Sequence, residues 1–160
     1  MNDARWLDVD DDLASAIRHF SRSVEIFERN GFAGDDLRPY MARMALLQAM
    51  QSAYTSLEAA FERILEILSE EKPTGLNYHA DLLRRISKEI PGIRPAIISG
   101  QLAEAVDEAR RFRHVARKSY DSFRLDGAAS AIASAAIIRD NLLPAMDAFR
   151  RKVDPDDGGD

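Results

Sequence analysis

Residues 111–120, RFRHVARKSY, bring together the side chains of this chain that are best suited to binding phosphate and moving a proton. The stretch holds three arginines, a lysine, a histidine and a tyrosine. Arginine binds phosphate oxygens through a fork of N–H donors, and histidine exchanges a proton close to neutral pH. Cleavage of RNA by its own 2′-hydroxyl needs both a base for the hydroxyl proton and a cation for the phosphate charge. The stretch is therefore a candidate ribonuclease site or, alternatively, the solvated face of one helix.

The spacing of these residues places them on one side of a helix. At about 100° per residue, two adjacent faces carry them: Arg110, Arg113, Arg117 and Tyr120 on the first, and His114, Lys118 and Asp121 on the second. We expect the charges to converge on one exposed face instead of encircling the helix. A merely solvated face would look the same, and Asp107 and Glu108 could neutralise part of the charge within one turn. The spacing alone leaves both interpretations open.

The composition indicates one folded domain. The chain has 160 residues, of which 46% are hydrophobic and 31% charged, a balance typical of globular proteins. It has no cysteine, which excludes disulfides, thiolate metal sites and a cysteine nucleophile. A net charge of −5 argues against a protein that coats nucleic acid with its whole surface, but a local basic patch is compatible with it.

The sequence gives no indication of export or membrane insertion. The first residues, MNDARWLDVDDD, lack a basic start followed by an apolar run. The most apolar stretch, residues 128–138, is bounded by Asp126 and Arg139 and is much shorter than a membrane span. We therefore expect a cytoplasmic protein that does not contact a membrane.

Apolar residues recur at helical spacing along most of the chain, and no segment alternates as a strand does. This pattern predicts an all-α fold, an up-and-down bundle of about five helices. Turn residues bound the expected helices, which run from Asp8 to Asn30, from Asp35 to Pro73, from Asn77 to Pro91, from Ser99 through the basic stretch, and from about Asp126 onward, with a kink or restart at Pro144. The second helix should be the longest. We predict a single helical domain over residues 1–152 and a disordered acidic tail over residues 153–160.

Other kinds of site find little support in the sequence. The three histidines, His19, His79 and His114, fall on separate predicted helices without the spacing of a metal motif, so we expect no metal. No glycine-rich phosphate loop or nucleophile elbow occurs, and we expect no cofactor. His79 is interpreted as a capping or packing residue.

Four segments of the chain, taken in order, resemble one known family. YTSLEAAFERILEIL, PTGLNYHADLLRRI, EIPGIRPAIIS and RFRHVARKSY occur in the order and spacing of the HepT-like branch of the HEPN superfamily. The resemblance covers roughly residues 45–150. It implies a HEPN-like helical bundle, metal-independent RNA cleavage in a basic cleft of a homodimer, and a minimal nucleotidyltransferase as antitoxin partner.

The family signature is an arginine followed by a polar residue and, after a short gap, a histidine and a tyrosine two residues later. Arg113, His114 and Tyr120 match the arginine, the polar residue and the tyrosine, whereas Lys118 stands where the histidine is expected. Lysine, with an ordinary pKa of about 10.4 against about 6.5 for histidine, is protonated at neutral pH and is a poor base. The resemblance implies that Tyr120 accepts AMP from the partner.

These matches give each residue an expected role. Arg113, His114 and Lys118 are the candidate catalytic residues, with His114 as the substitute base and Lys118 as a phosphate clamp. Arg110 and Arg117 are expected to bind RNA.

Two functions therefore stand open. The first is an endoribonuclease toxin that acts on tRNA or mRNA and is held in check by a nucleotidyltransferase antitoxin. The alternative is an inert HEPN binding module that keeps this partner but lost cleavage with the signature histidine. Both are compatible with the sequence.

Overall fold

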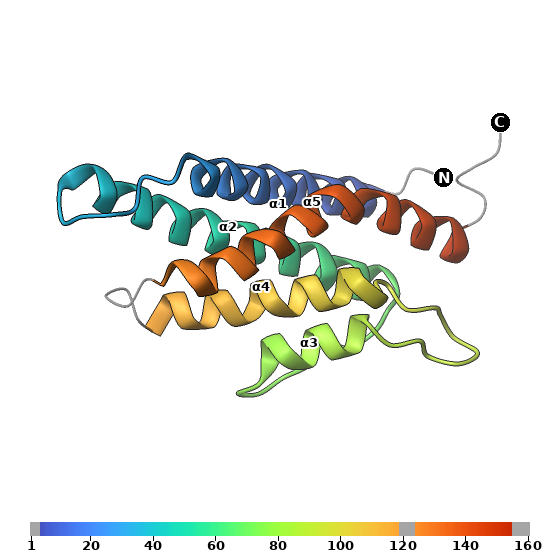
Figure 1. The fold of residues 1–160 in the computed structure, drawn as a ribbon. Helices are drawn as coiled ribbons and strands as arrows, with labels where there is room; N and C mark the ends of the chain where they lie inside the picture. The colour runs from blue at the N-terminus through green and yellow to red at the C-terminus, as the bar shows by residue number, and fades with distance from the viewer. Residues whose placement is uncertain (1–3, 119–123, 155–160) are drawn as a thin grey trace.

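A computed structural model describes residues 4–118 and 124–154 of the chain, which form five helices and no strand (Figure 1). The helices are α1 (Ala4–Arg29), α2 (Leu37–Ile67), α3 (Tyr78–Ile86), α4 (Gly100–Lys118) and α5 (Leu125–Val153). The all-α prediction is confirmed. The tail predicted over residues 153–160 lies outside the described residues except for its first two.

Four long helices run up and down through the molecule, and the short α3 lies at its lower edge in Figure 1. The helix α1 packs against α2 and α5, α4 packs against α5 and α2, and α3 packs against α4. As predicted, α2 is the longest described helix, with 31 residues against 29 in α5. None of the helices in the described ranges combines the length and apolar character that a membrane span requires.

One face of α2 forms the centre of the core. Its buried side chains recur every three or four residues, as the helical period requires: Leu46, Met50, Ala53, Tyr54, Leu57, Phe61, Ile64 and Leu65. The inner face of α1 has the same spacing, with Val9, Leu13, Ala16, Phe20 and Val24 buried. The sequence pattern underestimated the length of α1. The helix begins at Ala4 and not at Asp8, and Trp6 in this additional turn is also buried in the core.

The third helix is shorter than predicted, because α3 ends at Ile86 and not at Pro91. The carbonyl oxygen of Ile86 accepts hydrogen bonds from the backbone N–H groups of Ile97 and Ile98, at 2.8 and 3.3 Å. The chain after α3 therefore folds back over the end of the helix. The segment that follows α3 leads into α4, which begins at Gly100, directly after Ser99, as the sequence indicates. The helix α5 continues through Pro144 without a restart.

A buried arginine holds this returning segment in place. The side chain of Arg94 is 2% exposed and donates to both carboxylate oxygens of Glu70, at 2.8 and 3.0 Å. Its other donors bind the carbonyl oxygens of Arg85, Lys88 and Pro95. The bonds to Arg85 and Lys88 take up carbonyl groups that a longer α3 would have used for its own hydrogen bonds. Together with the Glu70 pair, they tie the end of α3 to the segment after α2.

We expect Arg94→Ala to lower the free energy of unfolding by about 3–5 kcal/mol, because it leaves the Glu70 carboxylate and three carbonyl groups without their shared donor. The matched control is Arg84→Ala, which removes an exposed arginine paired with Asp81 on the same helix and should change stability little. Urea unfolding followed by circular dichroism measures both. Equal unfolding midpoints for the two variants would show that Arg94 does not hold α3.

Candidate functional site

Residues 111–118 of the basic stretch lie on α4, but the arginines of this helix do not share one exposed face as predicted. Arg113 is half-buried, and its guanidinium carbon lies 5.9 Å from the centre of the Tyr54 ring on α2. Arg113 occurs between the buried Ala109 and Ala116, one turn to either side, so the helix directs it toward α2. The two alanines leave room for its aliphatic stem and flat guanidinium against an aromatic ring.

The Nε atom of Arg113 is buried and has no hydrogen-bond partner among the described residues. A buried donor without an acceptor is uncommon in folded proteins, and it is often found where a protein binds something. Arg113 is thus held at the interface of α2 and α4 without being neutralised by a direct ion pair within the described part of the chain.

The two arginines before it are paired on α4 itself. Arg110 is half-buried and binds Asp107 at 2.9 Å, and Arg111 binds Glu108 at 2.6 Å and Asp107 at 3.4 Å. For Arg110 and Arg111, the expectation that Asp107 and Glu108 neutralise part of the positive charge within one turn is correct. Ion pairs within one turn at a helix surface contribute little to stability, so the arginines can exchange a carboxylate for another anion.

The remaining predicted residues lie toward the end of α4. His114 and Arg117 are exposed, and neither forms a hydrogen bond or ion pair with another described residue. Lys118 is the last residue of α4. Tyr120 lies outside the described residues.

The sequence interpretation missed a buried carboxylate on α2, Glu58, on which the charge of Arg113 acts. The Glu58 side chain is 8% exposed, and its two oxygens lie 2.7 and 2.9 Å from Nδ1 of His79 on α3. When the carboxylate is ionised it can only accept, and Nδ1 is then the donor. Burial raises the pKa of Glu58 above its ordinary value, although the hydrogen bond and charge of His79 and the charge of Arg113 oppose the rise.

A second hydrogen bond joins the first turn of α3 to Glu62, which lies one turn after Glu58 on α2. The Tyr78 hydroxyl donates to Oε1 of Glu62 at 2.6 Å. The Tyr78 ring meets the His79 ring edge-on, with ring centres 5.7 Å apart. Burial and this carboxylate both raise the pKa of Tyr78. The first two residues of α3 are therefore fixed to two α2 carboxylates, and His79 is neither a capping residue nor simply a packing residue.

We call Tyr54, Glu58, Tyr78, His79 and Arg113 the Glu58 cluster. It joins α2, α3 and α4, and burial also raises the pKa of the Tyr54 hydroxyl. One signal in the sequence points to it, because Glu58 follows Tyr54 by four residues and falls on the apolar stripe of α2. A charged residue at a core position requires a partner, and that partner was not identifiable from local spacing.

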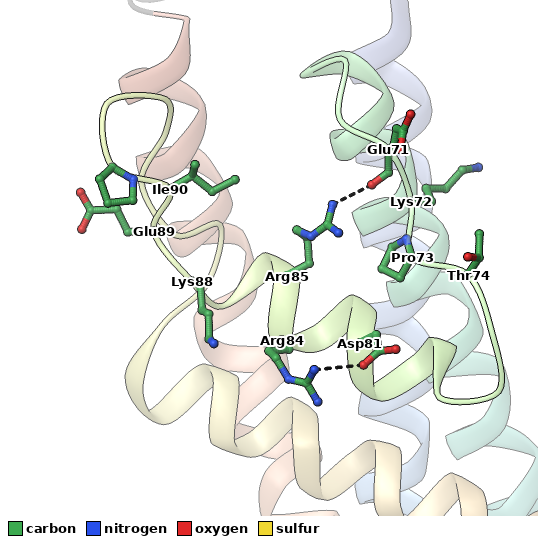
Figure 2. A pocket seen from close by; sticks show the side chains of 11 residues that line it. Glu71, Lys72, Pro73, Thr74, Asp81, Arg84, Arg85, Lys88, Glu89 and Ile90 are labelled. Atoms are coloured by element: carbon green, nitrogen blue, oxygen red, sulfur yellow. Dashed lines mark hydrogen bonds and ion pairs between the residues drawn. The ribbon is translucent and has the colours of Figure 1, made fainter.

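A separate hollow of about 710 Å³ lies between the segment after α2 and the C-terminal half of α3 (Figure 2). Arg84 binds Asp81 at 3.1 Å, and Arg85 donates to the Glu71 carbonyl at 2.8 Å. Lys72 and Lys88 add positive charge, and Glu71 and Glu89 add negative charge. None of Arg110, Arg113, His114 and Arg117 lines this hollow, and its mixed charges do not favour one kind of ion.

No group of three or more histidine, aspartate or glutamate side chains that could hold a metal occurs among the described residues. The Glu58 cluster and the end of α4 present a guanidinium, an imidazole and a carboxylate. Such groups bind a phosphate and transfer a proton.

Comparison with known proteins agrees with the resemblance noted in the sequence. The family described as HepT-like protein matches residues 45–153, a region that runs from α2 to the end of α5 and includes the whole Glu58 cluster. No curated protein and no solved structure shows significant similarity to the chain. Because the match covers more than half of the sequence, the chain belongs to the HepT-like family, a family of HEPN-type toxins.

Proposed function

We propose that this protein is the endoribonuclease toxin of a toxin–antitoxin pair and that it cleaves RNA without a metal ion. Membership of the HepT-like family implies a HEPN toxin of such a pair. The observation that carries the proposal further is Arg113, which matches the signature arginine and is held against Tyr54 with a buried, unpartnered donor. A guanidinium fixed in this way is prepared to bind a phosphate.

In the proposed reaction, the 2′-hydroxyl of RNA attacks the adjacent phosphorus and the bond to the 5′ oxygen breaks. The products are a 2′,3′-cyclic phosphate and a free 5′-hydroxyl. Arg113 stabilises the charge that develops on the phosphate, and Arg117 and Arg110 bind the neighbouring backbone. His114, exposed beside Arg113, is a candidate for the base that removes the 2′ proton. Lys118, protonated at neutral pH, acts as a further phosphate clamp.

The proposed partner is a minimal nucleotidyltransferase antitoxin, as the family generally implies. Transfer of AMP to Tyr120 would add a bulky anion two residues after Lys118. Because the added phosphate carries negative charge, it would compete with RNA for the same cations.

The substitution at the signature position favours a second function. Lys118 replaces the family histidine, and a chain that lost cleavage in this way would persist as a binding module for the nucleotidyltransferase. The two functions differ in whether the purified protein cuts RNA, since both retain the fold and the partner.

We expect the protein to form a symmetric dimer in which the two Arg113 residues face one groove. One copy has a net charge of −5, and Arg110 and Arg111 are already paired with acids, so a single α4 offers few cations to a strand of RNA. Light scattering at micromolar concentration should give twice the mass of the chain. A purely monomeric solution would contradict the shared groove.

Lys118→His should increase RNA cleavage by on the order of tenfold or more, because it restores an imidazole at the family position. The measurement is single-turnover cleavage of a mixed tRNA and mRNA pool by protein purified free of its partner. The control is Lys88→His, which replaces an exposed lysine outside α4 with a histidine and should not change the rate. Native protein that cuts no RNA but binds the nucleotidyltransferase would support the binding module instead.

Arg113→Gln should weaken RNA binding and reduce the slope of log affinity against log salt by about one, because one phosphate contact and its released counterion are lost. Arg22→Gln on α1, an exposed arginine paired with Glu25, serves as the matched control for loss of one charge. Filter binding over a range of salt concentrations measures both variants. The same slope for both would mean that Arg113 contacts no phosphate.

A further inference from the structure

We propose that His79, oriented by Glu58, is the group that takes the proton from the RNA 2′-hydroxyl in this protein. The inference rests on the proposed ribonuclease function and deepens it, because it assigns the base to α3 and not to α4. It names a residue outside the signature, which the sequence interpretation regarded as a capping or packing residue.

The first argument is the partner of each imidazole. All three histidines of the chain lie in the described ranges, and among the contacts within those ranges His79 alone has a hydrogen bond to a carboxylate. A carboxylate bound to Nδ1 fixes the tautomer and the ring orientation and stabilises the imidazolium that forms when the other nitrogen takes a proton. His114 has no such partner in the described part of the chain.

The second argument is accessibility. The His79 side chain is 41% exposed, while Glu58 behind it is 8% exposed. The imidazole therefore lies at the boundary between solvent and core, with its carboxylate partner on the buried side. The Tyr78 ring packs edge-on against it and limits its rotation. With Nδ1 engaged, Nε2 is the nitrogen left to meet a substrate.

The third argument is the position of Arg113. The charges of His79 and Arg113 both act on the Glu58 carboxylate, so the imidazole and the guanidinium belong to one electrostatic environment. The helices α3 and α4 pack against each other, and in Figure 1 α3 runs alongside α4. Arg113 contacts Tyr54 and His79 binds Glu58, one turn apart on α2, so a phosphate bound by Arg113 would lie near the imidazole.

The unfavourable burial of the Glu58 carboxylate supports a role beyond packing. Burial raises the pKa of this carboxyl, which means that the fold holds the charged form where it is disfavoured. Ionisable groups kept at such positions often serve reactions.

In the reaction, neutral His79 accepts the 2′-hydroxyl proton on Nε2 as the bond between the 2′ oxygen and phosphorus forms. Arg113 stabilises the charge on the phosphate oxygens while the bond from phosphorus to the 5′ oxygen breaks. The leaving 5′ oxygen takes a proton from water. The imidazolium then returns its proton to solvent, which balances the step without a metal or a cofactor. Lysine at position 118 is compatible with this scheme, because the base lies elsewhere.

The test compares three histidine variants in single-turnover RNA cleavage. His79→Asn keeps an N–H donor near the position of Nδ1, so Glu58 retains its hydrogen bond, but it lacks Nε2. We expect it to lose about 100-fold or more in rate while RNA binding is unchanged. His19→Asn on α1 is the matched control and should cleave as the native protein does. His114→Asn tests the rival base, and we expect a smaller loss.

Two further readouts separate proton transfer from structure. In His79→Ala, added imidazole should restore part of the cleavage, which a packing defect would not allow. In Glu58→Gln, the acid limb of the pH profile should move to lower pH, because a neutral amide no longer stabilises the imidazolium. The described contacts and charges also connect Tyr54, Tyr78, Glu62 and Arg113 with Glu58 or His79, and these groups are unchanged in this variant.

The outcomes are distinct. Native cleavage that survives in His79→Asn but is lost in His114→Asn overturns the inference and leaves the proposed function intact. Loss in His79→Asn, with imidazole rescue of His79→Ala, supports both. Native protein that cuts no RNA at all overturns both the inference and the proposed function.

Discussion

The arrangement of the site depends on how a helix too short to be stable alone is fixed to the bundle. The helix α3 has nine residues, below the length at which an isolated helix holds together in water. Leu82, Leu83 and Ile86 bury one face, and hydrogen bonds to charged groups fix both ends. Carboxylates of α2 hold the first turn, and the buried Arg94 binds the Arg85 carbonyl group in the last turn. Because these contacts set where α3 begins and ends, they also determine where its first side chains lie relative to α4.

The helix α2 serves as the common partner for both neighbours of the site. Tyr54 and Glu58 lie one turn apart on the same face of α2. Arg113 from α4 contacts the Tyr54 ring, and His79 from α3 binds the Glu58 carboxylate. Apolar packing along the rest of α2 holds this stripe rigid. A buried ionised group rarely improves stability over a well-packed apolar side chain of the same size. Stability therefore gives little reason for a carboxylate at this position, and the proposed role in orienting an imidazole would supply one.

The sequence predicted the elements better than the contacts between them. The apolar period of α1 and α2 and the start of α4 after Ser99 follow from local rules, and the structure agrees with them. The end of α3 could not be predicted, because it is set by Arg94, which reaches back to Glu70 across 24 residues. The pairing of Glu58 with His79 spans 21 residues and leaves no periodic trace. Arg113 was expected to be exposed since arginine usually is, but its place between two buried alanines directs it inward.

The contact of Arg113 with Tyr54 has a consequence for conformational entropy. A free arginine side chain loses about 2 kcal/mol of rotamer freedom when it is fixed. Because Arg113 is restrained against an aromatic ring in the folded chain, much of this loss occurs during folding and not when a ligand arrives. Arg117, which is exposed and contacts no described residue through a hydrogen bond or ion pair, still has to lose that freedom at the moment of binding. Two arginines one turn apart on the same helix are therefore unequal, and the pre-organised one gains more from each contact with an anion.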